Sequence, residues 1–352
     1  MSGRAEPAKL SGLEAGRGFA ASAVVLYHAA RHLDKVYGVP ALMSLFQFGH
    51  AGVDFFFVIS GFIILYVHYR DIGAPARLNH YIGRRFTRIM PTYWVALAIT
   101  AMLALGGGHG LPSLADVLWS VSLLPSDHRL LLDIAWTLRF EMMFYAVFCL
   151  LILNRAVGLA VVALWLGVVL TAFLGHIAIP SVPSALYGAF NLEFFLGMAA
   201  AYVVTNYAVP APKKLLLVGV ALFAMTAAAE DLGFLVGYAD TARLYYGIPA
   251  ALIVVGVARA GQTGQLPVPS PLRILGSASY SVYLFQFVFI GLVWKLWLSA
   301  GLGRLQPHAL VFLPLAAAGI VGGVLMSRYV EHPLIRMVRG RRRAIRPGAA
   351  LG

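Results

Sequence analysis

The stretch of sequence that decides the fold is V-G-L-A-V-V-A-L-W-L-G-V-V-L-T-A-F-L, residues 157–174. It consists of eighteen uncharged and mostly apolar residues. A helix of this length is just long enough to cross a hydrocarbon layer about 30 Å thick. We therefore predict a transmembrane helix here, and apolar segments of similar length recur along the chain.

Ten such helices are predicted, which makes the chain an all-α, polytopic membrane helix bundle. The composition agrees, because 12% of the 352 residues are charged, whereas soluble domains carry about 25%. We expect one membrane domain over residues 11–338, between an N-terminal tail (1–10) and a basic C-terminal tail (339–352). The approximate helix ranges are 17–34, 47–67, 86–105, 136–153, 157–174, 188–205, 214–229, 244–259, 277–298 and 308–329.

The positive charges are divided unevenly between alternate loops. If both termini are cytoplasmic, 20 lysines and arginines lie in inner segments and 5 in outer loops. This asymmetry follows the positive-inside rule and predicts an even number of spans, with both ends inside. The five outer cations are Arg31, Lys35, Arg129, Arg243 and Arg304.

The same distribution accounts for the formal net charge of +13 without nucleic acid. The basic residues lie between apolar segments and at the C-terminus, and no basic face is interleaved with aromatic residues. We expect the polybasic stretch 336–346 to contact anionic lipids.

Arg17 and His28 enclose an almost wholly apolar run, residues 18–27, in the first predicted helix. Their separation is close to three helical turns, so both side chains point from one face, roughly 16 Å apart along the axis. If Arg17 lies at the cytoplasmic surface, His28 lies near the middle of the hydrocarbon layer. An ionisable side chain is costly to bury there, so we predict that His28 belongs to a functional site.

Two other interpretations of this first helix are weaker. His28 and His32 are one turn apart, but no third ligand has the spacing that a metal site requires, so no metal is predicted. A cleaved signal peptide over residues 1–33 would need a cleavage site near Ala29 or Ala30. Cleavage there would remove His28 and invert the charge pattern that follows.

Further polar residues lie at membrane depth. His50 and Asp54 are four residues apart and so share one helix face, while Glu141 and Glu193 lie on two other predicted helices. A carboxylate near His28 could orient its imidazole and raise its basicity, which general-base catalysis needs. The alternative is that Asp54 and Glu141 only tie helices together through buried hydrogen bonds.

Arg85 and Arg88 are three residues apart at the inner end of the third predicted helix, so they share a face. Such a pair suits a polyphosphate ligand, because guanidinium groups bind phosphate bidentately. From the residues alone, anchoring at the membrane surface remains the stronger interpretation.

Taken together, these motifs resemble the acyltransferase family 3 of integral membrane proteins, and the first half is most similar to the ExoZ-like exopolysaccharide O-acetyltransferase branch. The resemblance covers residues 11 to about 338, with the motifs in family order. They are Arg17-x10-His28, Gly52-Val-Asp54-Phe-Phe-Phe-Val-Ile-Ser60-Gly61-Phe62, Arg85-x-x-Arg88-x-x-Pro91-x-Tyr93-Trp94, Trp136-Thr-Leu-x-x-Glu141-x-x-Phe-Tyr145, Ser279-Tyr280-Ser-x-Tyr283-Leu and Tyr329-x-Glu331-x-Pro333.

The resemblance implies a multi-pass O-acyltransferase (EC 2.3.1.-) of the bacterial inner (cytoplasmic) membrane, with no tightly bound cofactor. It would move an acyl group, commonly acetyl from cytoplasmic acetyl-CoA, to a hydroxyl of an exopolysaccharide, its lipid-linked repeat unit or another cell-surface glycan. His28 and Arg17 would form the essential site and Asp54 and Glu141 would orient His28 or hold the acceptor. Arg85 and Arg88 would bind the CoA donor, and the remaining substrate-binding candidates are Ser279, Tyr280, Tyr283 and Glu331.

One departure from the family pattern concerns the catalytic base. Gln286 stands where many members have histidine after the Ser-Tyr-x-x-Tyr-Leu motif. Glutamine cannot act as a base, so His28 becomes the more exclusive candidate.

Two alternatives remain open at this point. The chain could be an enzyme of the same family that acts on a small molecule, such as a macrolide, or on a peptidoglycan sugar. It could also be a transporter of acyl groups or lipid-linked sugars, with His28, Asp54 and Glu141 as a proton relay.

Overall fold

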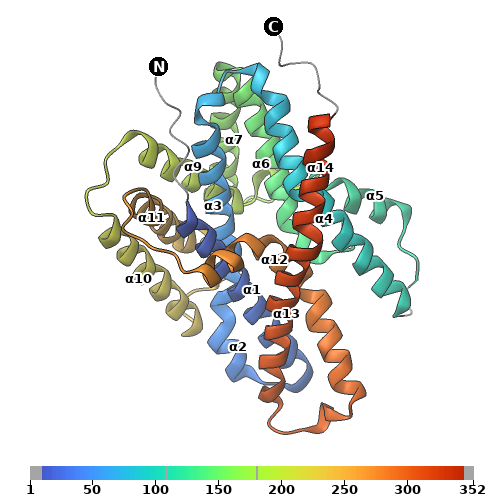
Figure 1. Cartoon of the computed structure of the whole chain (residues 1–352). Coiled ribbons are helices and arrows are strands. Elements are labelled where there is room, and N and C mark those ends of the chain that lie inside the picture. The colour runs from blue at the N-terminus through green and yellow to red at the C-terminus, as the bar shows by residue number, and fades with distance from the viewer. Residues whose placement is uncertain (1–9, 108–109, 180, 345–352) are drawn as a thin grey trace.

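The structure is a computed structural model that describes residues 10–107, 110–179 and 181–344. In those ranges every regular element is a helix, so the predicted all-α class is confirmed (Figure 1). The principal helices are α1 (Ser11–Tyr37), α3 (Gly52–His68), α4 (Leu78–Gly106), α6 (Trp136–Leu153), α7 (Arg155–Gly175), α9 (Phe190–Asn206), α10 (Pro212–Asp231), α11 (Ala242–Gln262), α12 (Ser270–Ser299), α13 (Phe312–Met326) and α14 (His332–Ala344).

Three shorter helices join these elements. They are α2 (Pro40–Phe46), α5 (Leu114–Ser122) and α8 (Ser184–Tyr187). One of the free backbone N–H groups in the first turn of α5 is capped, because the Ser113 hydroxyl accepts a hydrogen bond from the amide of Asp116 at 3.1 Å. We predicted no membrane helix between α4 and α6. The structure has a short, N-capped helix there, which is not among the segments long enough to cross a membrane.

Nine helical segments in the described part of the chain are long and apolar enough to cross a membrane. They correspond to nine of the ten predicted spans. The tenth, α1, forms as a helix of 27 residues but is not among those nine, because it carries five charged residues. These are Glu14, Arg17, Arg31, Asp34 and Lys35.

The polar helix α1 is enclosed by other helices. It packs against α2, α3, α11, α12 and α13, and its buried positions are mostly small or aliphatic residues such as Ala21, Val25 and Ala29. Since these neighbours surround it, α1 does not need an apolar surface all round to lie within the bundle.

Glycine residues let α3 approach α9 closely. A Cβ atom at Gly61 would overlap the backbone carbonyl of Phe194, and one at Gly197 would overlap the backbone carbonyl of Val58. Small residues at helix contacts of this kind are common in membranes, where close van der Waals packing replaces the hydrophobic effect. The contact fixes the position of α3, which carries several residues of the candidate site.

Connections between helices gather at two ends of the bundle. In Figure 1 the α3–α4 and α6–α7 connections lie at the upper end and the α12–α13 connection at the lower end. The first two were predicted to be inner and the third outer, so the alternation agrees with the charge map. Which end faces the cytoplasm stays a prediction.

The terminal segments are described only in part. Arg336 and Arg339 are exposed on α14, as a lipid-contacting surface requires. The side chains of residues 341–344, all of residues 345–352 and residues 1–9 lie outside the description, so the lipid contact of the tail also stays a prediction.

We expect Gly197→Ala to lower the melting temperature of the detergent-purified protein. The added methyl group must displace α3 from α9, and overpacking of this kind costs about 1–3 kcal/mol. Gly167→Ala on α7 is the matched control, since nothing lies within 4 Å of its Cβ position. Equal melting temperatures for the two variants would contradict the close α3–α9 packing.

Candidate active site

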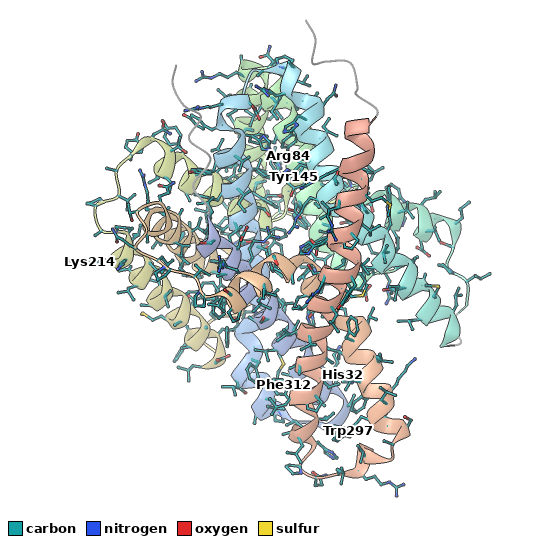
Figure 2. The ribbon with its side chains drawn as sticks, in the orientation of Figure 1. His32, Arg84, Tyr145, Lys214, Trp297 and Phe312 are labelled. Atoms are coloured by element: carbon teal, nitrogen blue, oxygen red, sulfur yellow. The ribbon has the colours of Figure 1, made fainter. Side chains whose placement is uncertain are left out.

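Two cavities lie beside α1 in the described structure. The larger, about 520 Å³, is lined by His28 and the smaller, about 60 Å³, by Arg17. Figure 2 shows Tyr145 and Arg84 in the upper half of the bundle and His32 in the lower half. Arg17 and His28, which the sequence placed on one helix face, thus line two different cavities.

The His28 ring is held by a glutamine. Gln286 Nε2 donates a hydrogen bond to the backbone carbonyl of Tyr283 (2.8 Å), which leaves its Oε1 facing His28 Nδ1 at 3.0 Å. An amide oxygen can only accept, so Nδ1 of a neutral His28 carries the hydrogen and Nε2 keeps its lone pair. Edge-to-face contacts with Tyr27 and Phe287, at centroid distances of 4.9 and 4.6 Å, fix the ring further.

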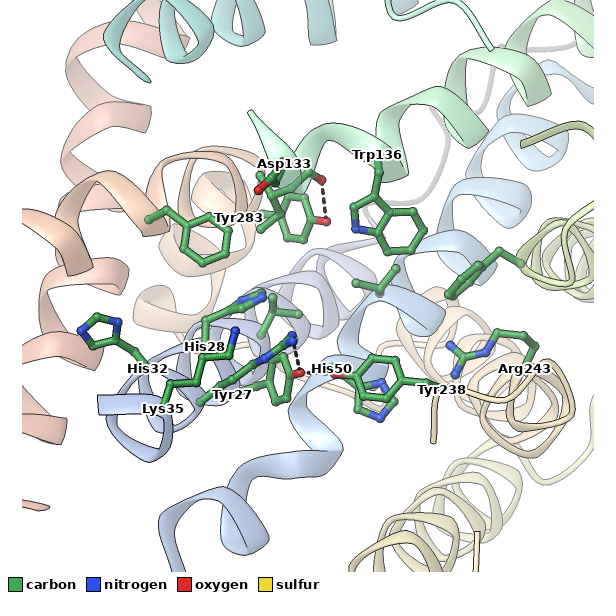
Figure 3. A pocket seen from close by; sticks show the side chains of 16 residues that line it. Tyr27, His28, His32, Lys35, His50, Asp133, Trp136, Tyr238, Arg243 and Tyr283 are labelled. Carbon is green, nitrogen blue, oxygen red and sulfur yellow. Dashed lines mark hydrogen bonds between the residues drawn. The ribbon is translucent and has the colours of Figure 1, made fainter. Parts of the chain in front are cut away.

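Aromatic and cationic side chains make up much of the larger cavity (Figure 3). The Tyr27 hydroxyl is hydrogen-bonded to that of Tyr238 and accepts a hydrogen bond from Arg31 Nη1 at 3.0 Å. His50 stacks on Tyr238 with 4.7 Å between ring centroids. The lining also contains His32, Lys35, Trp136, Phe190, Arg243 and Tyr283.

Asp54 and His50 do not contact His28 but pair with other residues. Asp54 Oδ1 accepts a hydrogen bond from Arg243 Nη1 at 2.5 Å, and His50 Nε2 lies 2.9 Å from Glu230 Oε1. Asp54 therefore does not orient His28, whose Nδ1 faces Gln286 instead. The other predicted role of Asp54, holding the acceptor, stays a prediction. The Asp54–Arg243 ion pair ties α3 to α11, as the structural alternative proposed.

Glu230 is the centre of a second buried group. Its carboxylate accepts hydrogen bonds from the Tyr246 hydroxyl (2.6 Å) and Gln47 Nε2 (3.1 Å), in addition to its contact with His50. Tyr246 lies on α11, whereas Gln47 and His50 both lie on the segment before α3, so Glu230 ties α10 to these two elements. Glu193 is fully buried as well, and its carboxyl group lies within hydrogen-bonding reach of that of Asp54.

The smaller cavity contains Arg17 and Glu141. Glu141 accepts hydrogen bonds from Ser60 Oγ (3.2 Å) and from the Tyr145 hydroxyl, so it also does not orient His28. Arg17 Nε is buried and has no hydrogen-bond partner in the described structure. It remains able to donate to a ligand in this cavity.

Val53 and Tyr283 line both cavities and therefore stand between them. The Tyr283 hydroxyl donates to the Ile134 carbonyl at 3.1 Å and lies 3.0 Å from Thr137 Oγ1. Ile134 lies in the 3-10 turn just before α6 and Thr137 in the first turn of α6, so two contacts at this junction hold the Tyr283 ring. We call this pair of side chains, Val53 and Tyr283, the partition.

Arg85 and Arg88 differ in what they have available for a ligand. Arg88 Nη1 lies 2.9 Å from Glu331 Oε1, whereas Arg85 Nε is buried without a hydrogen-bond partner in the described structure. Arg85 also lies over the Tyr145 ring, 5.8 Å from its centroid. Arg85 is thus the freer donor for an anionic ligand.

Glu331 lies in a π-helical turn, Ser327–Glu331, between α13 and α14. Besides Arg88 it accepts a hydrogen bond from Ser281 Oγ at 2.7 Å, so it connects α4, α12 and the last membrane helix. Tyr280 donates to the Ile89 carbonyl at 3.0 Å and packs beneath the Arg88 guanidinium. Glu331 and Tyr280 therefore support Arg88, and their predicted role in binding substrate stays a prediction.

A family model described as an acyltransferase domain matches residues 10–328 of this chain. The chain belongs to the acyltransferase family. It is similar to the exopolysaccharide production protein ExoZ of Rhizobium meliloti (strain 1021), with 32% identity over 315 residues, 87% of this chain and 95% of that protein. It is also similar to the acyltransferase MdmB of Streptomyces mycarofaciens, with 28% identity over an alignment of 381 residues, 96% of this chain and 94% of that protein.

No solved structure shows a significant match. The family match confirms the resemblance drawn from the motifs and identifies the chain as an enzyme, an acyltransferase. The transporter alternative gives way to this assignment.

Six of the ten predicted site residues of this acyltransferase line one or both of the two cavities, and Asp54, Arg85, Arg88 and Glu331 line neither. His28 and Tyr283 line the larger cavity. Arg17, Glu141, Ser279, Tyr280 and again Tyr283 line the smaller one, and Ser279 Oγ has no hydrogen-bond partner in the described structure.

Sequence reasoning missed two residues of the acyltransferase site, Arg243 and Glu230. Both lie one residue outside the predicted helices 244–259 and 214–229, and Arg243 was counted among the loop cations. Helix boundaries predicted from sequence are uncertain by two to four residues. An ionisable residue just outside a predicted helix can therefore lie within that helix in the structure, as these two do.

We expect Asp54→Leu to destabilise the acyltransferase by about 3–5 kcal/mol, because it leaves the Arg243 guanidinium buried and unpaired. Replacing both partners, with Asp54→Leu and Arg243→Met, should restore most of the loss. Thermal unfolding of the two single variants and the double variant in detergent measures the coupling. A double variant no more stable than Asp54→Leu alone would contradict the ion pair.

Proposed function

We propose that this acyltransferase moves an acetyl group from cytoplasmic acetyl-CoA to a hydroxyl of an exopolysaccharide or of its lipid-linked repeat unit, in the bacterial inner membrane. The observation that carries the proposal is His28, whose Nε2 keeps a lone pair in a cavity large enough for sugar residues. The ExoZ relative is an exopolysaccharide production protein, which supports the choice of acceptor.

The donor would approach the smaller cavity. Arg17 lines this cavity and has an unpartnered Nε, as does Arg85, whose guanidinium lies over the ring of Tyr145. Phosphate oxygens accept charge-assisted hydrogen bonds from guanidinium groups. Arg88 would add positive charge while remaining paired with Glu331. The thioester end of the donor would then reach toward the partition.

The acceptor would occupy the larger cavity, with one hydroxyl at His28 Nε2. As the hydroxyl oxygen attacks the thioester carbonyl, Nε2 takes its proton, a new C–O bond forms and the C–S bond breaks. The CoA thiolate leaves and then takes the proton from His28, which regenerates the neutral imidazole. The Nδ1–H···Oε1 hydrogen bond to Gln286 keeps Nε2 free at the start of each cycle.

His28 could instead carry the acetyl group on Nε2 between two steps. Both general-base catalysis and transfer through an acetylated His28 require the tautomer that has its hydrogen on Nδ1 and a lone pair on Nε2. A ping-pong kinetic pattern would indicate the acyl-enzyme, and a sequential pattern would indicate direct transfer.

We expect His28→Ala to lower acetyl transfer at least about 100-fold, the lower end of what a general base contributes. Labelled acetyl-CoA and purified protein in liposomes give the rate, and mass spectrometry of glycan from a complemented deletion strain gives the product. His332→Ala is the matched control, because His332 is exposed on α14. Acetylation retained by a folded His28→Ala protein would refute the assignment.

Gln286→Glu should shift the acid limb of the pH–rate profile to higher pH. A carboxylate facing Nδ1–H stabilises the protonated imidazole, so His28 stays protonated and inactive as a base over a wider acidic range. Gln286→Leu should lower the rate, since nothing then selects the Nδ1–H tautomer. Unchanged profiles in both variants would show that Gln286 does not set the state of His28.

A further inference from the structure

The mouth of the larger cavity carries two cations, Arg31 and Lys35, on one face of α1. They are one helical turn apart and both are exposed. Figure 3 shows the Lys35 side chain extending into the cavity that contains His28. Three of the five cations that the charge map placed in outer loops, these two and Arg243, line this one cavity.

Arg31 and Lys35 are the cations in the lining of the larger cavity that lack an ion-pair partner in the described structure. Arg243 is neutralised by Asp54 at 2.5 Å, and Asp133, the lining carboxylate, lies 3.5 Å from Arg129. In contrast, neither Arg31 nor Lys35 forms an ion pair in the part of the chain that the structure describes. Arg31 donates one hydrogen bond, to the Tyr27 hydroxyl, so most of its donors remain free.

The remaining walls suit a carbohydrate. Tyr27, Trp136 and Tyr238 present aromatic surface together with groups able to form hydrogen bonds. The cations lie beyond His28 along the same helix, about 4.5 Å away for Arg31 and about 10 Å for Lys35 at 1.5 Å per residue. One or two sugar residues cover that distance.

We propose that the acceptor is anionic, with a carboxylate or phosphate that binds Arg31 and Lys35 while a hydroxyl one or two sugar residues away reaches His28. This inference rests on the proposed function and specifies the acceptor of that same site. A guanidinium and an ammonium group at one cavity mouth attract an anion, and the guanidinium can hold it bidentately. Two sources supply this chemistry, an acidic sugar of the glycan and the pyrophosphate of a lipid carrier.

The test compares matched acceptors with acetyl-CoA and the full-length protein in detergent micelles. The first pair is a uronic-acid oligosaccharide and its carboxyl-reduced form, which differ only in the carboxylates. The second pair is a neutral glucose disaccharide, free or linked to polyprenyl pyrophosphate. The protein variants are Arg31→Gln/Lys35→Gln and, as control, Arg304→Gln, an exposed cation outside the cavity lining.

We expect kcat/KM to be about tenfold higher for the anionic member of at least one pair, as charge-assisted hydrogen bonds provide. The preference should arise mainly in KM, fall with added salt and disappear in Arg31→Gln/Lys35→Gln but not in Arg304→Gln. Preference within the first pair identifies an acidic sugar, and preference within the second identifies the carrier pyrophosphate.

Equal kcat/KM within both pairs for the native protein, or a preference that survives in the double variant, would overturn the anionic acceptor and leave the proposed function standing. If no acceptor is acetylated, the proposed function fails and the inference fails with it. Melting temperatures establish that the double variant is folded, which its two exposed positions favour.

Discussion

A hydrocarbon layer tolerates polar side chains only where the protein itself encloses them, and in this molecule the constraint falls on α1. That helix carries Arg17 and His28, and it lies within the bundle because five other helices pack against it. The close glycine contacts between α3 and α9 are part of the same enclosure. Both cavities of the candidate site lie beside α1, a helix that is too polar to face lipid alone.

The sequence was sufficient for the fold class and for ten helix positions, because apolar length is a local property that each segment carries by itself. The spacing of Arg17 and His28 likewise placed them on one face, and α1 is continuous between them. Motif order was enough to indicate the family. These inferences use short-range information, which a single sequence contains.

The partners of the polar residues could not be predicted in the same way. Asp54 pairs with Arg243, 189 positions later in the chain, and His28 with Gln286, 258 positions later. Such pairs depend on how helices are arranged, which hydropathy and spacing do not encode. His28 was therefore assigned a carboxylate partner, whereas the structure gives it an amide, and an amide constrains the tautomer without adding charge.

The partition has a consequence for the membrane itself. If the proposed donor and acceptor reach the partition from opposite faces of the membrane, the protein must keep protons and other ions from passing between the two cavities, because such a leak would dissipate the membrane potential. Val53 and Tyr283 border both cavities, and Tyr283 is held by two hydrogen-bonding contacts at the junction between the 3-10 turn and α6. An acetyl group is small and uncharged, so it is a cargo that a narrow apolar constriction can pass while hydrated ions are excluded.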